Sequence, residues 1–387
     1  MTNYSNHRLP IVYLYLLLFL MGIAPATAQK TVNVPMRANA WDVGDRRVEF
    51  TTHRGEPALR AYDPQGNTVN SVLRVRDLEF TNGTIEYDVA LTDSTRFTTC
   101  YFRLQDGANT EHVYLRANFV DDPNAMAAVQ YAATVDGVNY WDLSPHYQSN
   151  ANLRGDGQWN HVKIIVRERQ LLAYVNDMEV PTLYVPVMDG EIETGGIGVD
   201  GSVFIANLRI TPDHTPGLGG GRGYDPVHND PRYLRQWTVT TPRNFPFGTE
   251  PSEDDMPTDT TVWQPIAAEH HGTVNLSRPY GGTSFDGRRR LAWLRTTITA
   301  DREQERYLDL GFTDEVYIYL NGRPLYVGKN QFATPGMLPP GGRMSIENSR
   351  IRLPLREGDN EILVGLTNYF YGWGLVARLD DSGGLRY

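Results

Sequence analysis

Short runs in which apolar and polar side chains alternate make up most of the chain. In residues 316–320, valine, isoleucine and leucine alternate with tyrosines, which is the two-residue period of a strand with one buried face. Asn321 and Gly322 follow, and both tolerate the positive φ angles of a tight hairpin turn. Residues 325–327 can return as the partner strand. The pattern therefore predicts a β-hairpin over 316–327.

The same kind of pattern recurs from residue 33 to residue 211, where helical periodicity is nearly absent. Strand-like runs at 98–104 and 112–118 are separated by a loop that contains Asp106-Gly107, a strong turn signal. Many short strands separated by turns are typical of a β-sandwich. We therefore predict that this half of the chain is a sandwich domain.

A glycine- and proline-rich stretch at 214–232 interrupts the strand pattern and reads as a linker. Strand-like runs resume at residue 233 and continue to the end of the chain. We predict an all-β protein with one β-sandwich domain at 29–213 and a second at 233–387.

The first residues have the features of a secretory signal peptide. Arg8 supplies a positive start, residues 11–23 are almost entirely apolar, and Ala26-Thr27-Ala28 resembles a cleavage site. An uncleaved membrane anchor is the alternative, but the apolar run is shorter than the roughly 20 residues of a spanning helix. We predict that residues 1–28 are removed and that the mature protein is exported without membrane insertion, to the periplasm, the cell surface or the medium.

Charge and cysteine content narrow the choice of partners. The formal net charge is −10, which disfavours binding to nucleic acid or to an anionic membrane surface. Cys100 is the single cysteine of the sequence, so an internal disulfide is impossible. It lies in a strand-like run and is expected to be a small buried apolar residue.

Four segments of the first half resemble, in their order, the laminin-G-like or concanavalin A-like jelly roll: Gly83–Asp88, Phe102–Gly107, Trp159–Lys163 and Gly195–Gly198. The resemblance covers about residues 31–212, and His112–Arg116 with Tyr140-Trp141 resembles a secreted bacterial branch of it. The superfamily includes lectins, glucanases and adhesion modules, so the resemblance implies a fold more than an activity.

Four segments of the second half resemble the galactose-binding-like jelly roll: Ala292–Arg295, Tyr319–Leu325, Leu355–Asn360 and Gly372–Gly374. This resemblance covers about residues 233–387. Such modules accompany many secreted glycosidases. Together the two resemblances imply two jelly-roll sandwiches joined by the linker, with carbohydrate as the expected partner.

Glu86 and Asp88 lie two residues apart on one predicted strand, so their side chains share a face. The pair resembles the start of the E-x-D-x-x-E strand of concanavalin-like β-glucanases. A retaining glycosidase needs two carboxyl groups about 5 Å apart, and the position of the second glutamate holds Leu91. Glu86 and Asp88 are kept as catalytic candidates, with charges on a solvated face as the alternative.

A second set of residues combines planar donors, which suit sugar hydroxyls, with aromatic rings, which suit the C–H faces of sugars. It consists of Arg103, Asp106, Arg116, Tyr131, Tyr140 and Trp141, with Tyr371 and Trp373 from an aromatic loop near the C-terminus. These are the ligand-binding candidates. The alternative for the first six is a structural Arg–Asp pair with core aromatics, and the alternative for the aromatic loop is core packing or an inter-domain contact.

Signals for metals and cofactors are weak. Glu269-His270-His271 could offer ligands, but no HExxH helix surrounds it. Acidic loops at Asp121-Asp122 and at residues 253–255 could hold a structural calcium ion, although neither has EF-hand spacing. No cofactor is expected, and calcium is the one ion that the pattern allows.

The sequence therefore predicts an exported carbohydrate-binding protein that recognises a glycan or a polysaccharide fragment. A glycoside hydrolase-like enzyme is one alternative, although no complete catalytic constellation supports it. A non-catalytic module for cell-surface adhesion or assembly is the other. The oligomeric state has no signature in the sequence.

Overall fold

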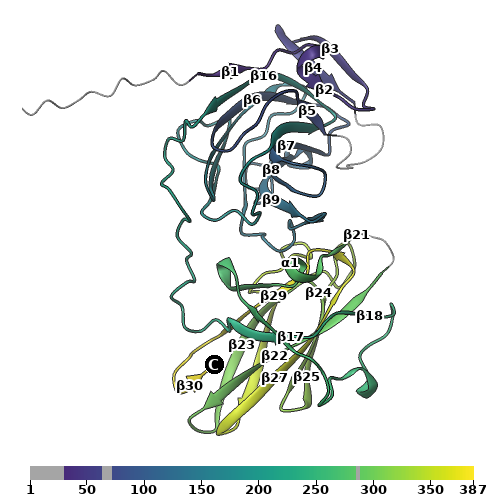
Figure 1. The fold of residues 1–387 in the computed structure, drawn as a ribbon, viewed down its shortest axis with the longest axis vertical. Coiled ribbons are helices and arrows are strands. Elements are labelled where there is room, and N and C mark those ends of the chain that lie inside the picture. Colours follow the sequence, from purple (N-terminus) through teal and green to yellow (C-terminus); the bar gives the residue numbers. More distant parts are fainter. Residues whose placement is uncertain (1–29, 63–71, 285–287) are drawn as a thin grey trace, which may run out of the picture.

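The computed structural model describes residues 30–62, 72–284 and 288–387. Within these ranges the chain is almost entirely β-structure, which confirms the predicted fold class. Figure 1 shows the strands grouped into two bodies, one above the other, with the chain that connects them running down one side. The predicted signal peptide lies outside the described residues.

The first sandwich has two antiparallel sheets. One, called the β6 sheet, has the order β14-β13-β12-β6-β16-β4-β3, with β1 beside β16. Its strands are β1 (Val32–Asn33), β3 (Val48–His53), β4 (Glu56–Ala61), β6 (Gly83–Leu91), β12 (Trp159–Arg167), β13 (Gln170–Val175), β14 (Leu183–Val185) and β16 (Val203–Pro212).

The facing sheet, called the β8 sheet, has the order β10-β9-β8-β7-β15-β5-β2, with β11 beside β9. Its strands are β2 (Trp41–Asp42), β5 (Leu73–Val75), β7 (Phe97–Leu104), β8 (Thr110–Arg116), β9 (Val129–Val135), β10 (Val138–Asn139), β11 (Gln148–Ser149) and β15 (Gly196–Gly201), and short 3-10 helices occur at Ala38–Ala40 and Ala117–Phe119. The predicted pairing of the β7 and β8 segments is confirmed.

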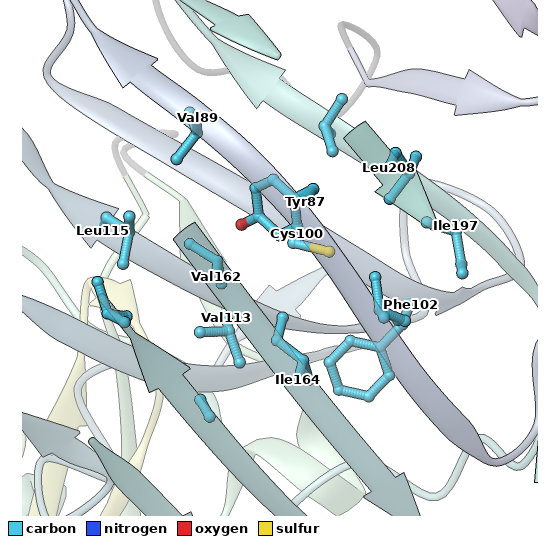
Figure 2. Packing of buried hydrophobic residues seen from close by; sticks show 14 of the residues in the cluster. Tyr87, Val89, Cys100, Phe102, Val113, Leu115, Val162, Ile164, Ile197 and Leu208 are labelled. Carbon is cyan, nitrogen blue, oxygen red and sulfur yellow. The ribbon is translucent and has the colours of Figure 1, made fainter. Parts of the chain in front are cut away.

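The core between these sheets follows from strand alternation, because every second side chain points inward. Figure 2 shows Tyr87 of β6 beside Cys100 of β7, and Val89 of β6, Phe102 of β7 and Val113 of β8 belong to the same buried cluster. Cys100 is fully buried, as expected from the sequence. The residues between the inward positions must therefore face away from the core.

The second sandwich has one sheet with the strand order β19-β17-β22-β27-β24-β25, in which β18 and β30 also pair with β22. The other sheet has the order β20-β29-β23-β26, and β21 and β28 form a small separate pair. The elements are β17 (Gln236–Val239), β18 (Arg243–Asn244), a 3-10 helix (Glu253–Asp255), β19 (Gln264–Ala267), a 3-10 helix (His270–Gly272), β20 (Thr273–Asn275), α1 (Ser277–Tyr280), β21 (Thr283–Ser284), β22 (Arg290–Ala300), β23 (Gln304–Phe312), β24 (Asp314–Leu320), β25 (Arg323–Asn330), β26 (Ser349–Leu355), β27 (Gly358–Asn368), β28 (Phe370–Tyr371), β29 (Gly374–Leu379) and β30 (Leu385–Arg386).

The hairpin predicted from residues 316–327 is confirmed as β24 and β25. Asn321 and Gly322 form its turn with φ angles of 53° and 76°, in the left-handed region that such turns require. Helices long and apolar enough to cross a membrane are absent from the part of the chain that is described.

The two sandwiches meet through a small apolar cluster, called here the junction cluster. It contains Val138, Tyr140 and Leu143 of the first sandwich with Tyr233, Met344 and Val376 of the second. Backbone hydrogen bonding adds to it, because the Met344 amide donates to the Asp142 carbonyl at 2.9 Å. The segment after β10 therefore docks the second sandwich onto the β8 sheet.

Candidate functional site

The outward face of the β8 sheet carries a row of rings. Tyr101 of β7 lies opposite His112 of β8, and Tyr114 follows two residues later on the same face. The ring centroids are 5.5 Å apart for Tyr101 and His112, and 5.9 Å apart for His112 and Tyr114. The Tyr101 hydroxyl donates to the Asp200 carboxylate at 2.7 Å, which fixes the orientation of the ring. Tyr101 is half-buried, whereas His112 and Tyr114 form a buried floor.

A hydrogen-bonded network continues this face towards the second sandwich. The oxygen Oε1 of Gln130 accepts from the Tyr114 hydroxyl at 2.8 Å and from Arg116 Nη2 at 2.6 Å. Gln130 Nε2 donates to the Trp141 carbonyl at 2.8 Å. Burial raises the pKa of Tyr114 to about 12, so its hydroxyl remains a donor at neutral pH. These polar groups are therefore held in fixed orientations.

Aromatic rings from both sandwiches meet at the end of this network. The Trp141 ring lies 5.1 Å from Phe332 and 6.3 Å from Tyr371, both edge to face. The Arg343 guanidinium lies 5.6 Å from the centroid of Trp141 and donates to the Gln148 side chain. Trp141 and Tyr371 are half-buried. Planar guanidinium and amide groups and partly exposed aromatic rings thus lie close together where the second sandwich docks.

One polar atom of this face lacks a partner. His112 Nδ1 is buried and makes no hydrogen bond with the described residues. Its Nε2 lies 3.4 Å from the Asn139 amide nitrogen. Burial lowers the pKa of His112 to about 3, so the ring is neutral at physiological pH. An unpaired buried nitrogen costs roughly 1–3 kcal/mol, and a water or ligand hydroxyl would remove that cost.

Of the ligand candidates predicted from the sequence, the structure gathers Arg116, Trp141 and Tyr371 at this site. Arg103 is elsewhere, because the antiparallel register places Arg116 opposite Phe97. Six residues of strand separate Phe97 from Arg103, about 20 Å at ~3.3 Å per residue. The Arg103 guanidinium is buried and donates to the carbonyls of Thr81 and Ile192 at 2.9 and 3.0 Å.

The other four candidates also have local partners. Asp106 accepts from two amides of its own turn, and the buried Tyr131 hydroxyl donates to Glu111 at 2.6 Å. Tyr140 belongs to the junction cluster. Trp373 is fully buried in the core of the second sandwich. The structure does not bring these four side chains into contact with the face described above.

Sequence reasoning missed Tyr101, His112, Tyr114, Gln130 and Arg343. A signal for the residues of β8 was present, because Val113 and Leu115 mark the inward positions and so assign their neighbours outward. Gln130 and Arg343 had no comparable signal, since their roles depend on contacts between distant segments.

Glu86 and Asp88 occupy the outward face of the β6 sheet. His161 Nδ1 lies 2.6 Å from Asp88 Oδ1, and its Nε2 lies 3.7 Å from Glu86 Oε2. Burial alone would raise the pKa of Asp88, but hydrogen bonds from His161 and Asn207 outweigh that effect and lower it. Glu86 is paired with Arg209 through Nε at 2.7 Å. Asp88 and His161 border a hollow of about 410 Å³.

Glu86 and Asp88 have no third carboxylate at the position where the β-glucanase resemblance implies a second glutamate. Leu91, which holds that position, is buried in the core of the first sandwich. The imidazole of His161 stands between the two carboxylates instead. The arrangement offers a carboxylate–histidine pair beside a hollow, together with an arginine that neutralises the other carboxylate.

Among the residues with assigned positions, no group of three or more histidine, cysteine or acidic side chains is arranged to hold a metal ion. In the acidic loop at 253–255, Asp255 accepts from the Ser252 amide at 2.8 Å and is paired with Arg243. In the other loop, Asp122 accepts from the Asn124 amide at 3.2 Å. Calcium binding by either loop stays a prediction.

Comparisons with known proteins give partial likenesses of fold. No protein-family model and no curated protein matches the chain. A carbohydrate-binding module, CBM66 of Bacillus subtilis, is 12% identical and aligns over 44% of this chain and 95% of its own, with a TM-score of 0.30. A putative glycosyl hydrolase from Parabacteroides distasonis is 13% identical over 47% of this chain and 99% of its own, with a TM-score of 0.34.

The β-glucanase of Bacillus licheniformis is 12% identical over 47% of this chain and 97% of its own, with a TM-score of 0.31. In each case nearly the whole of the solved chain aligns with less than half of this one. At these identities and TM-scores, nothing about the activity of this chain follows from the likeness.

Proposed function

We propose that this chain is an exported carbohydrate-binding protein whose ligand lies on the outward face of the β8 sheet, at the edge where the second sandwich docks. The observation that carries the proposal is one continuous face of rings and planar polar groups. At one end the partly open rings of Trp141 and Tyr371 are in contact, and the Trp141 carbonyl accepts from Gln130, which is bonded to Arg116. The partly open ring of Tyr101 lies at the other end, beyond His112 and Tyr114. Aromatic faces pack on sugar C–H surfaces, and planar donors and acceptors bind hydroxyl groups.

The fixed geometry of the polar groups favours binding. Gln130 and Arg116 are already hydrogen-bonded to each other and to Tyr114, so little side-chain freedom is lost when a ligand arrives. Ordering a long side chain on binding costs about 0.5–1.5 kcal/mol, and this cost is largely met during folding. Both sandwiches contribute rings, so the site is complete only when they are docked.

Affinity electrophoresis on a broad panel of plant and microbial polysaccharides tests the proposal. We expect wild-type protein to be retarded by at least one polysaccharide, and Tyr101→Ala and Trp141→Ala to weaken that binding at least tenfold. Tyr101 is used because it lies away from the junction cluster. Tyr184→Ala is the control, since this ring is 46% exposed on β14 of the other sheet. A panel without retardation, or equal binding by Tyr101→Ala, would overturn the proposal.

A hydrolase-like activity is the second candidate, and the contact between Asp88 and His161 at 2.6 Å favours it. A carboxylate can orient an imidazole and stabilise its charged form, as general acid–base catalysis requires. We expect Asp88→Asn to abolish any release of reducing sugar from a saccharide mixture, while retardation on polysaccharide gels persists. Turnover that is equal in wild type and Asp88→Asn would exclude this role.

A further inference from the structure

A second hollow, of about 740 Å³, lies where the first sandwich, the linker and the second sandwich come together. Its volume is within the roughly 300–1,000 Å³ that is usual for ligand sites. The first sandwich contributes Arg169 and Asp189, the linker contributes residues 222–225, 228 and 229, and the second sandwich contributes His270 and Arg278. This hollow is separate from the ring-lined face, because neither Trp141 nor Tyr371 borders it.

Three guanidinium groups in the lining have no carboxylate partner among the described residues: Arg169, Arg222 and Arg235. Arg169 Nε donates to the Met188 carbonyl at 3.1 Å, and Arg235 donates to the Val227 carbonyl. Arg222 makes no hydrogen bond or ion pair with a described group. Carbonyls satisfy donors without forming an ion pair. Asp189 acts on Arg169 only at a distance, so a carboxylate from a ligand would make the first close ion pair with these guanidinium groups.

The fourth arginine shows which acids are already engaged. Arg278 is held by Glu269 through two bonds of 2.5 and 2.8 Å, and Glu191 lies 3.5 Å from it. The Asp189 carboxylate accepts from Ser144 at 2.6 Å. Asp225 uses one oxygen in the linker turn and faces His270 at 3.6 Å with the other. Free acceptor capacity thus remains on Glu191 and Asp225, beside the unpaired arginines.

Two further groups of the lining suit a sugar. Tyr224 is 73% exposed, so its ring is open to a ligand in the hollow. His270 Nε2 is buried and has no partner among the described groups. Burial, then Arg222 and Arg169, lower the pKa of His270 against the opposing effect of Asp225. The imidazole is therefore neutral and can either donate or accept.

We infer that this hollow is a second saccharide site, specific for an acidic sugar such as a uronic acid residue. Arg169 and Arg222 would hold the sugar carboxylate, Glu191 and Asp225 would accept from its hydroxyls, and the ring would pack on Tyr224. A neutral sugar would form no ion pair with the arginines, and a simple anion would not use the tyrosine. The inference rests on the proposed function, since it assigns the hollow to the same class of ligand.

Isothermal titration with trigalacturonate, and with a neutral galactose trisaccharide as comparison, tests the inference. We expect trigalacturonate to bind more tightly, and Arg222→Gln and Tyr224→Ala each to weaken its binding at least tenfold. Both residues are exposed on the linker, so these variants should fold. Arg323→Gln removes an exposed arginine of β25 and serves as the charge-matched control, which should bind as wild type does.

The two sites can be separated by the same titrations. If trigalacturonate binding responds to Arg222→Gln and not to Tyr101→Ala, the second site stands independently of the ring-lined face. If it responds to Tyr101→Ala and not to Arg222→Gln, the inference is wrong and the proposed function is retained. Equal binding by Arg222→Gln and Arg323→Gln, or no binding of trigalacturonate at all, would also overturn the inference.

Discussion

Replacing Gly372 with alanine should separate the two sandwiches without unfolding either. The Gly372 amide donates to both carboxylate oxygens of Asp142, at 3.2 and 3.1 Å, so this hydrogen bond crosses between the sandwiches. A Cβ added to Gly372 would lie 2.6 Å from Leu143 Cγ and closer still to Asp142 Oδ1. Both obstacles belong to the first sandwich, so the steric conflict acts directly on the docked arrangement.

The size of the effect follows from two terms. Forcing extra volume into a packed contact costs about 1–3 kcal/mol, and loss of the hydrogen bond to Asp142 adds about 0.5–1.5 kcal/mol. The sum is about 1.5–4.5 kcal/mol. We therefore expect Gly372→Ala to give a larger radius of gyration in small-angle X-ray scattering and faster proteolysis within the linker at 214–232.

Gly336→Ala is the matched control, because the nearest atom to its added Cβ is 3.7 Å away, which is an ordinary contact. It should leave both the scattering profile and the cleavage rate at wild-type values. If Gly372→Ala scatters and is cleaved like Gly336→Ala, the added methyl group does not strain the docked arrangement in solution and the prediction is wrong.

Two further predictions concern buried charges. Burial raises the pKa of Glu111 from 4.5 to about 7, although the hydrogen bond from the Tyr131 hydroxyl opposes the shift. The folded state therefore binds the Glu111 proton more tightly than the unfolded state does. Stability should fall by up to about 3 kcal/mol as pH rises from 4.5 to 7. Glu111→Gln should flatten that slope in urea unfolding at pH 5 and 8, and an unchanged slope would contradict the assignment. Arg289 is paired with Glu315 in the interior, so Arg289→Met should lower stability by about 3–5 kcal/mol because it leaves the Glu315 carboxylate without its partner. Adding Glu315→Gln should recover part of that stability in thermal unfolding. No recovery would show that the unpaired Glu315 charge is not the cause of the loss.

Local features of the fold could be predicted from the sequence because their causes are local. The hairpin at 316–327 needs only an alternating pattern and two residues that accept positive φ, and both are visible in the chain. The pairing of β7 with β8 follows from the Asp106-Gly107 turn in the same way. Which residues of paired strands meet depends on register, and the register places Arg116 opposite Phe97. For that reason Arg103 and Arg116 were grouped by sequence although the fold separates them.

The aromatic loop near the C-terminus shows the same limit for side-chain direction. Tyr371 and Trp373 are two residues apart, yet Tyr371 faces Trp141 and Trp373 is enclosed in the second core. Tyr371 has a φ angle of 43°, so the backbone does not keep the simple alternation of a strand here. A density of aromatic residues in the sequence cannot distinguish a ring in the core from one at the docking edge.

The segment from Val138 to Leu143 links docking to the candidate site. Tyr140 and Leu143 pack in the junction cluster, Trp141 joins the rings of the second sandwich, and Asp142 receives the Gly372 amide. Trp141, which would contact the ligand, therefore lies between residues that hold the two sandwiches together. Opening the junction must displace Tyr371 and Arg343 from Trp141, because both come from the second sandwich. Gly372→Ala should consequently weaken polysaccharide binding at the ring-lined face, although Gly372 has no side chain to offer a ligand. If binding at that face were unaffected while the sandwiches separated, the first sandwich alone would hold the ligand and the contribution of the second would have to be withdrawn.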